Sequence, residues 1–116
     1  MNVKRKGTAG ENELAEILRG AGIRAYRNDQ IFTGGRNNPD VSAEIDGYQL
    51  HIEVKRVEKL NVPEAMRQAV RDAERFQDGM PALFHRRNRQ PWLVTVELEA
   101  LLTALGKEKA ACSPSE

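Results

Sequence analysis

Two carboxylates that a tight turn brings face to face are the clearest candidates for chemistry in this 116-residue chain. Asp46-Gly47 is a strong hairpin signal, because a type I′ turn needs positive φ at both central residues. With these residues in the turn, Asp40 faces Glu53 with Cβ atoms about 5 Å apart, and Lys55 lies on the same side of the sheet. Facing like charges destabilise a plain sheet, whereas a bound divalent cation would reverse the sign of that interaction. The pattern therefore predicts a metal site with an adjacent ammonium group.

The opposite side of the same hairpin is apolar, which supports this register. A slip of one residue would move the charged side chains into the core. An ordinary half-exposed sheet with a polar outer side is the alternative interpretation of the hairpin. The alternating apolar residues are Val41, Ala43, Ile45, Leu50, Ile52 and Val54.

A third carboxylate, Glu11, is predicted to point toward the buried side of the first helix. At 100° per residue, Glu11 lies about 60° from Leu14 and about 20° from Leu18 around the helix axis. A carboxylate beside an apolar stripe costs free energy unless it is paired or binds a metal. The alternative is that Glu11 only complements the helix dipole in the first turn.

Periodicity, capping residues and turn residues predict the elements that position these groups. Their order is α-β-β-β-α-β-β-α, an α/β fold in which helices flank a central mixed β-sheet. The hairpin strands are antiparallel, and the second helix makes a crossover to the next strand. The predicted helices span about residues 8–21, 61–77 and 97–105, the strands span 23–27, 40–45, 48–57, 82–85 and 92–96, and a loop covers 28–38.

The bulk composition indicates a single domain over residues 1–106, which starts with a basic arm at 1–7 and is followed by a disordered tail at 107–116. The 18 Lys and Arg nearly balance the 17 Asp and Glu, so net charge does not indicate a nucleic-acid partner. The single cysteine, Cys112, excludes a disulfide framework. No signal peptide and no membrane-length apolar run is found, so a cytoplasmic location without a membrane partner is expected.

The candidate residues also carry a family resemblance. Pro39-Asp40 and Glu53-Val54-Lys55 resemble the signature of the PD-(D/E)XK nuclease superfamily. Further segments resemble the archaeal Holliday-junction resolvases, and the similarity covers about residues 4–97. The chain departs from those resolvases at Thr33, the only hydroxyl residue in the loop before Asp40, and at Asn12, where an arginine is often found. The resolvase-like segments are Arg5-Lys6-Gly7 with Glu11, Glu13 and Leu14, then Gly22-Ile23 with Tyr26-Arg27, and Glu53 to Phe76.

The resemblance implies a restriction-endonuclease-like fold and Mg²⁺-dependent hydrolysis of DNA phosphodiesters, with Mn²⁺ able to substitute for Mg²⁺. It assigns Asp40 and Glu53 as metal ligands together with the backbone carbonyl of Val54. Glu11 would complete the catalytic site as a further acid and metal ligand, and Lys55 would orient the attacking water or help to deprotonate it.

The implied substrate is branched DNA, in recombination and repair, and a homodimer is expected because a junction has two-fold character. A nuclease of the same fold that acts on flaps, nicks or single-strand ends is one alternative. A non-catalytic DNA-binding module is another. The residues predicted to bind DNA are Lys4, Arg5, Lys6, Arg27, Arg36, Arg56 and Lys59.

Other polar groups are interpreted as structural. His51 shares the face of Glu53 and could contact DNA or a metal, but a hydrogen-bonded sheet histidine is expected. Trp92 is expected in the core or at a dimer contact. The alternating charges of the second helix, Asp72 among them, are typical of a solvated helix face. For the arginine-rich turn at 86–89, DNA binding and simple solvation are both left open.

Overall fold

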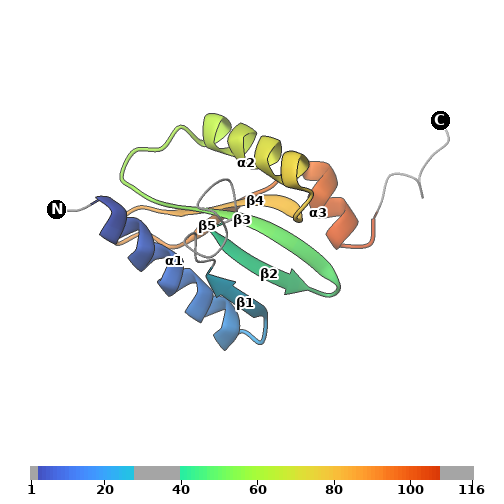
Figure 1. Cartoon of the computed structure of the whole chain (residues 1–116), viewed down its shortest axis with the longest axis horizontal. Helices are drawn as coiled ribbons and strands as arrows, with labels where there is room; N and C mark the ends of the chain where they lie inside the picture. The colour runs from blue at the N-terminus through green and yellow to red at the C-terminus, as the bar shows by residue number, and fades with distance from the viewer. Residues whose placement is uncertain (1–2, 28–39, 108–116) are drawn as a thin grey trace.

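A five-stranded mixed sheet, with strand order β1-β2-β3-β4-β5, forms the centre of the molecule (Figure 1). The computed structural model describes residues 3–27 and 40–107. All neighbouring strands pair antiparallel except β3 and β4, which are parallel. The predicted element order and fold class are confirmed. The elements are α1 (Val3–Gly20), β1 (Arg24–Arg27), β2 (Val41–Ile45), β3 (Tyr48–Arg56), α2 (Val62–Phe76), β4 (Met80–Arg86), β5 (Leu93–Thr95) and α3 (Leu98–Ala104).

The hairpin of β2 and β3 has the predicted register. Its pairs run from Ile45 with Tyr48 to Val41 with Ile52. The turn between the strands has positive φ at both of its central residues, as a type I′ turn requires; φ is 51° at Asp46 and 86° at Gly47.

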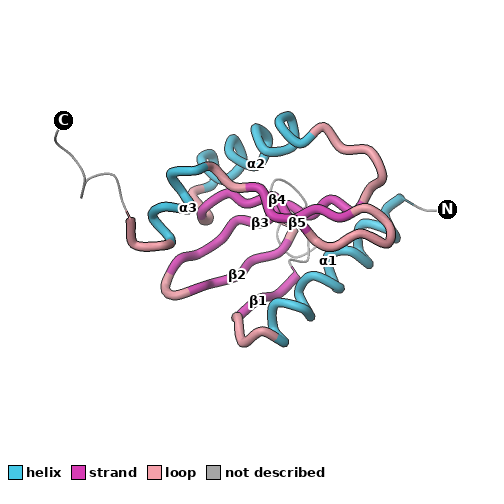
Figure 2. Tube along the Cα trace, turned by 180° about the vertical axis from the view of Figure 1, so that it is seen from behind, coloured by secondary structure: helices cyan, strands magenta, loops and turns pink. Residues whose placement is uncertain are grey.

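Helices cover both faces of the sheet, with α1 on one side and α2 on the other (Figures 1 and 2). Leu14 and Leu18 of α1 pack into a core with the apolar side of the hairpin. On the other face α2 packs against β4 and β3, and it buries Met66, Ala69 and Ala73. The polar side of the hairpin is therefore covered in part: Ser42 and His51 are buried, whereas Glu44 and Gln49 are exposed.

Most predicted element boundaries agree with the structure to within one residue, and two differ by more. Helix α1 begins at Val3 rather than at residue 8, so residues 3–7 are helical and do not form an arm; Lys and Arg are good helix formers. Strand β4 begins at Met80 and includes Pro81. At the end of the described residues, the N–H of Lys107 donates to the carbonyl of Leu102 at 2.7 Å. The predicted 28–38 loop and the tail from residue 108 lie outside the described residues. No helix in the described ranges is both long and apolar enough to cross a membrane.

A close backbone contact fixes the turn between α2 and β4. Gly79 has φ of 132°. A Cβ at this position would lie 2.8 Å from the backbone nitrogen of His51 and 2.9 Å from the backbone carbonyl oxygen of Gln49. Gly79→Ala is therefore expected to lower the free energy of unfolding by about 2–4 kcal/mol, because backbone strain and a backbone clash add. Urea unfolding measures the loss.

A matched control for this substitution lies in the hairpin turn. Gly47 also has positive φ, at 86°, but a Cβ there would meet no atom within 4 Å. Gly47→Ala should therefore cost only the conformational strain, about 1 kcal/mol. Equal losses in the two variants would contradict the close contact at Gly79.

Candidate active site

Asp40, Glu53 and Glu11 come together from three parts of the chain. Asp40 lies immediately before β2, Glu53 lies in β3, and Glu11 lies in the N-terminal half of α1. The Asp40 carboxylate accepts a hydrogen bond at Oδ2 from the backbone N–H of Val54, at 2.9 Å. This bond attaches the Asp40 side chain to β3, one residue beyond Glu53.

The pKa of Asp40 reflects the crowding of negative charge. Burial, followed by the charge of Glu53, raises the pKa of Asp40 to about 7. The hydrogen bond from Val54 and the charge of Lys55 oppose this rise, and Glu11 adds to it. The four residues predicted to be catalytic therefore lie close enough to act on one another electrostatically. Their excess of negative charge over the single ammonium group is an environment that a cation would stabilise.

Arg27 holds Glu11 in place. The Nε atom of Arg27 lies 2.9 Å from Glu11 Oε1, which joins the end of β1 to α1. Burial raises the pKa of Glu11; Arg27 opposes that rise and Glu53 adds to it. The DNA contact predicted for Arg27 would have to coexist with this ion pair.

The structure places the other predicted DNA-binding residues only in part. Arg56 is half-buried, with its Nε 3.9 Å from Glu13 Oε1. Lys59 is exposed, just beyond the end of β3. The backbones of Lys4, Arg5 and Lys6 lie in the first turns of α1, but their side chains are outside the described part of the chain. Arg36 lies outside the described residues altogether.

His51 is the hydrogen-bonded sheet histidine that the sequence predicts, and it lies against the candidate site. Its Nε2 lies 3.1 Å from Glu53 Oε2, and its Nδ1 lies 2.7 Å from Asp78 Oδ1. Burial alone would lower the pKa of His51, but the hydrogen bonds to Glu53 and Asp78 outweigh burial and raise the pKa. His51 thus links Glu53 to Asp78. The two-residue spacing of His51 and Glu53 was the only signal for this in the sequence, because Asp78 is 27 residues away.

The comparison with protein families gives a match over nearly the whole chain. A family model described as "Phage putative PDDEXK endonuclease" matches residues 2–113. The chain belongs to this PDDEXK endonuclease family. The family assignment agrees with the acidic pair and lysine at Asp40, Glu53 and Lys55. A comparison with curated proteins gives no significant match.

A solved structure supports the same relationship. This PDDEXK protein is similar to Hjc of Archaeoglobus fulgidus, a Holliday junction resolvase from an archaeal hyperthermophile. The TM-score is 0.57 at 26% sequence identity, and the match covers 74% of this chain and 72% of that chain. The resemblance to nucleases and to archaeal resolvases that the sequence predicted is therefore confirmed.

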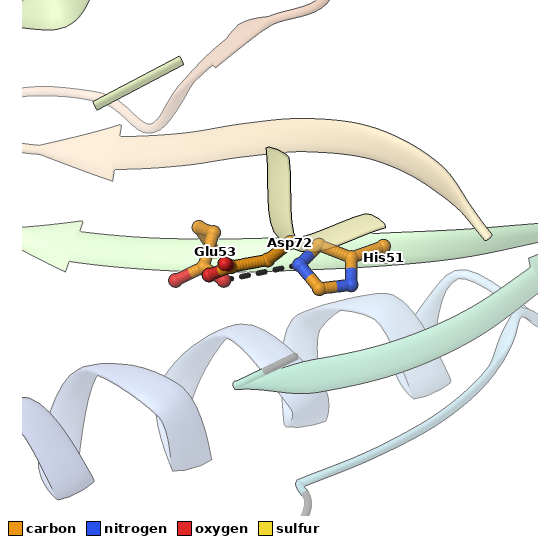
Figure 3. A group of neighbouring side chains, drawn as sticks. All are labelled: His51, Glu53 and Asp72. Carbon is orange, nitrogen blue, oxygen red and sulfur yellow. Dashed lines mark hydrogen bonds and ion pairs between the residues drawn. The ribbon is translucent and has the colours of Figure 1, made fainter. Parts of the chain in front are cut away.

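Two different sets of metal ligands could include Glu53 of the PDDEXK site. Asp72 reaches the site from α2, and ligand atoms of His51, Glu53 and Asp72 lie within 4.8 Å of one another (Figure 3). The sequence predicted that Asp72 lies on a solvated helix face. That prediction is wrong, because Asp72 lies beside His51 and Glu53. Both ring nitrogens of His51 are already bonded to carboxylates, and a histidine that donates from both nitrogens has no lone pair left for a metal. The chemistry of the donors therefore favours the oxygen set around Asp40 and Glu53.

The link from Asp78 through His51 to Glu53 can be tested by removing its outer member. Asp78→Ala is expected to weaken Mn²⁺ binding about 10–100-fold, because partners that orient a metal ligand contribute on that scale. Isothermal titration calorimetry with Mn²⁺ measures the affinity. Glu74→Ala, which removes an exposed acid of α2, is the control. Unchanged Mn²⁺ affinity in folded Asp78→Ala would show that the link has no role in the site.

Proposed function

We propose that this protein is a Mg²⁺-dependent, structure-selective DNA endonuclease of the Holliday-junction resolvase type. The observation that carries the proposal is the convergence of Asp40, Glu53 and Glu11 beside Lys55, with the pKa of Asp40 raised to about 7. Support comes from the family assignment and from the similarity to Hjc, whose substrate class is carried over here as a proposal.

The donor set suits a hard divalent cation. Mg²⁺ prefers oxygen ligands and keeps several of its waters, so one or two carboxylates are sufficient to bind it. Asp40, Glu53 and the carbonyl of Val54 would hold the ion, with Glu11 beside them, and Mn²⁺ would substitute. When bound, Mg²⁺ supplies charge neutralisation at the transferring phosphate and lowers the pKa of a bound water.

The side chains of the protein have separate roles in this mechanism. Lys55 supplies a compact positive charge that orients the attacking water and balances the phosphate. The N–H of Val54 fixes the orientation of Asp40. His51 fixes Glu53, and Arg27 fixes Glu11. Each acidic group that would face the ion therefore has its own partner, which limits its movement during the reaction.

The proposed enzyme acts as a homodimer, because paired cuts in a two-fold junction need two symmetric active sites. A set of exposed apolar residues on β5, on α3 and directly after α3 supports this assembly, since such patches mark contact surfaces. Light scattering after size-exclusion chromatography should give a dimer mass at micromolar concentration, and a monomer mass alone would refute the assembly. The exposed residues are Leu93, Val94, Leu98, Leu101 and Leu105.

A cleavage assay with several substrates tests the proposed activity. The purified protein is incubated with a labelled four-way junction, a flap and a linear duplex, in Mg²⁺ or in EDTA. We expect paired, Mg²⁺-dependent nicks in the junction. Equal cutting of all three DNAs would reject junction selectivity and leave a less selective nuclease. Junction binding without any cutting would favour a non-catalytic DNA-binding module.

A further inference from the structure

A second polar site lies where β3 and β4 end. An open groove of about 640 Å³ is lined by Arg56, Glu58, Arg86, Asn88 and Arg89, and we call it the arginine groove. Arg56 and Arg86 are partners in the parallel pairing of β3 with β4, so they lie side by side on one face of the sheet. Arg89 comes from the turn that connects β4 to β5.

The acidic groups around the arginine groove leave it positively charged. Glu58 accepts a hydrogen bond from the N–H of Asn88 at 2.7 Å, which anchors the β4–β5 turn. Glu13 of α1 pairs with Arg86 and lies 3.9 Å from the Nε of Arg56. The carboxylates of Glu58 and Glu13 therefore balance only two of the three guanidinium groups of the groove. Within the described ranges, the Nε of Arg56 is buried and has no hydrogen-bond partner.

The backbone of Arg89 is unusual for an arginine. The N–H of Gln90 donates to the carbonyl of Arg87 at 3.1 Å, which closes a tight turn. Arg89 has φ of 63° at the third position of this turn, where glycine or asparagine is normally found. The turn therefore holds a guanidinium group at the edge of the groove in spite of backbone strain, and such strain is concentrated at functional sites.

We propose that the arginine groove binds a backbone phosphate of the DNA substrate, away from the phosphate that is cut. Guanidinium groups present planar pairs of donors that match phosphate oxygens. Arg56 follows Glu53 by three residues, about 10 Å along the strand, and the alternation of the strand places its side chain on the opposite face of the sheet, where Glu13 of α1 lies. This inference rests on the proposed function for its substrate class. It assigns the groove to one arm of the DNA, which the groove holds without reading the base sequence.

Arg89→Gly is the most direct test, because glycine relieves the backbone strain while it removes the charge. The melting temperature should be unchanged or higher. Duplex and junction affinity, measured in EDTA by fluorescence anisotropy, should fall about 3–10-fold, and the slope of log K against log salt should decrease by about one. Arg89→Lys, which keeps the charge, should retain most of the slope.

Two controls separate the groove from general effects. Gln77→Gly relieves the backbone strain of a positive φ at the end of α2, as Arg89→Gly does in its turn. Arg75→Ala removes an exposed arginine from α2. Both variants should bind DNA like the wild type. Wild-type affinity and salt slope in Arg89→Gly would overturn the proposal. Competition by inorganic phosphate alone, without any effect of Arg89→Gly on DNA, would also overturn it and identify a free-anion site. DNA binding is measured in EDTA, so it does not depend on cleavage. If the wild-type protein cut no DNA, the proposed function would be refuted, but the binding measurements would still test the arginine groove.

Discussion

Asp40→Asn is expected to reduce DNA cleavage by about 100-fold or more and to stabilise the metal-free protein. The loss of activity follows from removal of a ligand charge at the proposed metal site. The gain in stability follows from the pKa of Asp40, which rises from 3.8 to about 7 on folding, first because of burial. The amide oxygen of Asn can still accept the hydrogen bond from Val54, so the local geometry should persist.

The sign of the pH dependence follows from proton binding. Between pH 4 and 7 the folded protein binds more protons at Asp40 than the unfolded chain, because its pKa is raised to about 7. The contribution of Asp40 to stability therefore decreases as the pH rises through this window and becomes constant above it. Each pKa unit corresponds to about 1.4 kcal/mol. Allowing for solvent screening and for coupling to Glu53, a gain of about 1–3 kcal/mol is expected for Asp40→Asn at pH 7.5.

Urea unfolding at pH 5, 6 and 7.5 in EDTA, together with junction cleavage in Mg²⁺, measures both effects. Glu44→Gln is the matched control, since it removes an exposed carboxylate from β2. If Asp40→Asn were more stable but cut DNA normally, Asp40 would be a structural residue only. If the two proteins had the same stability at every pH, the crowding of carboxylates around Asp40 would be refuted.

Lys55→Ala is expected to slow cleavage by about 100- to 1000-fold with little change in DNA affinity. The ammonium group opposes the rise in the pKa of Asp40, so it lies within electrostatic reach of the acidic cluster. Its removal takes away the charge that would orient the attacking water, but it leaves the carboxylates in place. Single-turnover cleavage at saturating Mg²⁺ and DNA isolates the chemical step from binding.

Two variants make the Lys55 experiment specific. Lys107→Ala removes an exposed lysine at the other end of the chain and should cut like the wild type. Lys55→Arg keeps the charge in a larger, planar group and should recover only part of the rate. A rate for Lys55→Ala within about threefold of the wild type would remove Lys55 from the mechanism.

The hairpin that carries most of the site could be predicted because its determinants are local. Asp46 and Gly47 specify the turn, and strict alternation on both strands specifies which side chains face the core. Glu11 could be predicted from its helical angle to Leu18, because α1 packs on the sheet by that apolar stripe. The start of α1 at Val3 could not be predicted, because residues 3–7 carry no apolar periodicity.

The contribution of α2 could not be predicted in the same way. The parallel pairing of β3 with β4 requires a crossover helix, and that helix covers part of the polar side of the hairpin. Charge alternation along α2 reports only that one side is polar, and it cannot show that Asp72 lies near Glu53. The contact of His51 with Asp78 depends on the close backbone approach at Gly79, which is a feature of tertiary structure.

Because the backbone N–H of Val54 donates to Asp40, the NMR signal of this amide should report on the candidate site. The side-chain oxygen at 2.9 Å takes the place that a strand carbonyl would occupy in the ladder. Its strength as an acceptor depends on whether the carboxylate carries a proton, an ion or neither. The amide resonance of Val54 in a nitrogen–proton NMR spectrum should therefore follow both the titration of Asp40 and the arrival of a cation. The charge state of the candidate site can thus be observed in the native protein without an added label.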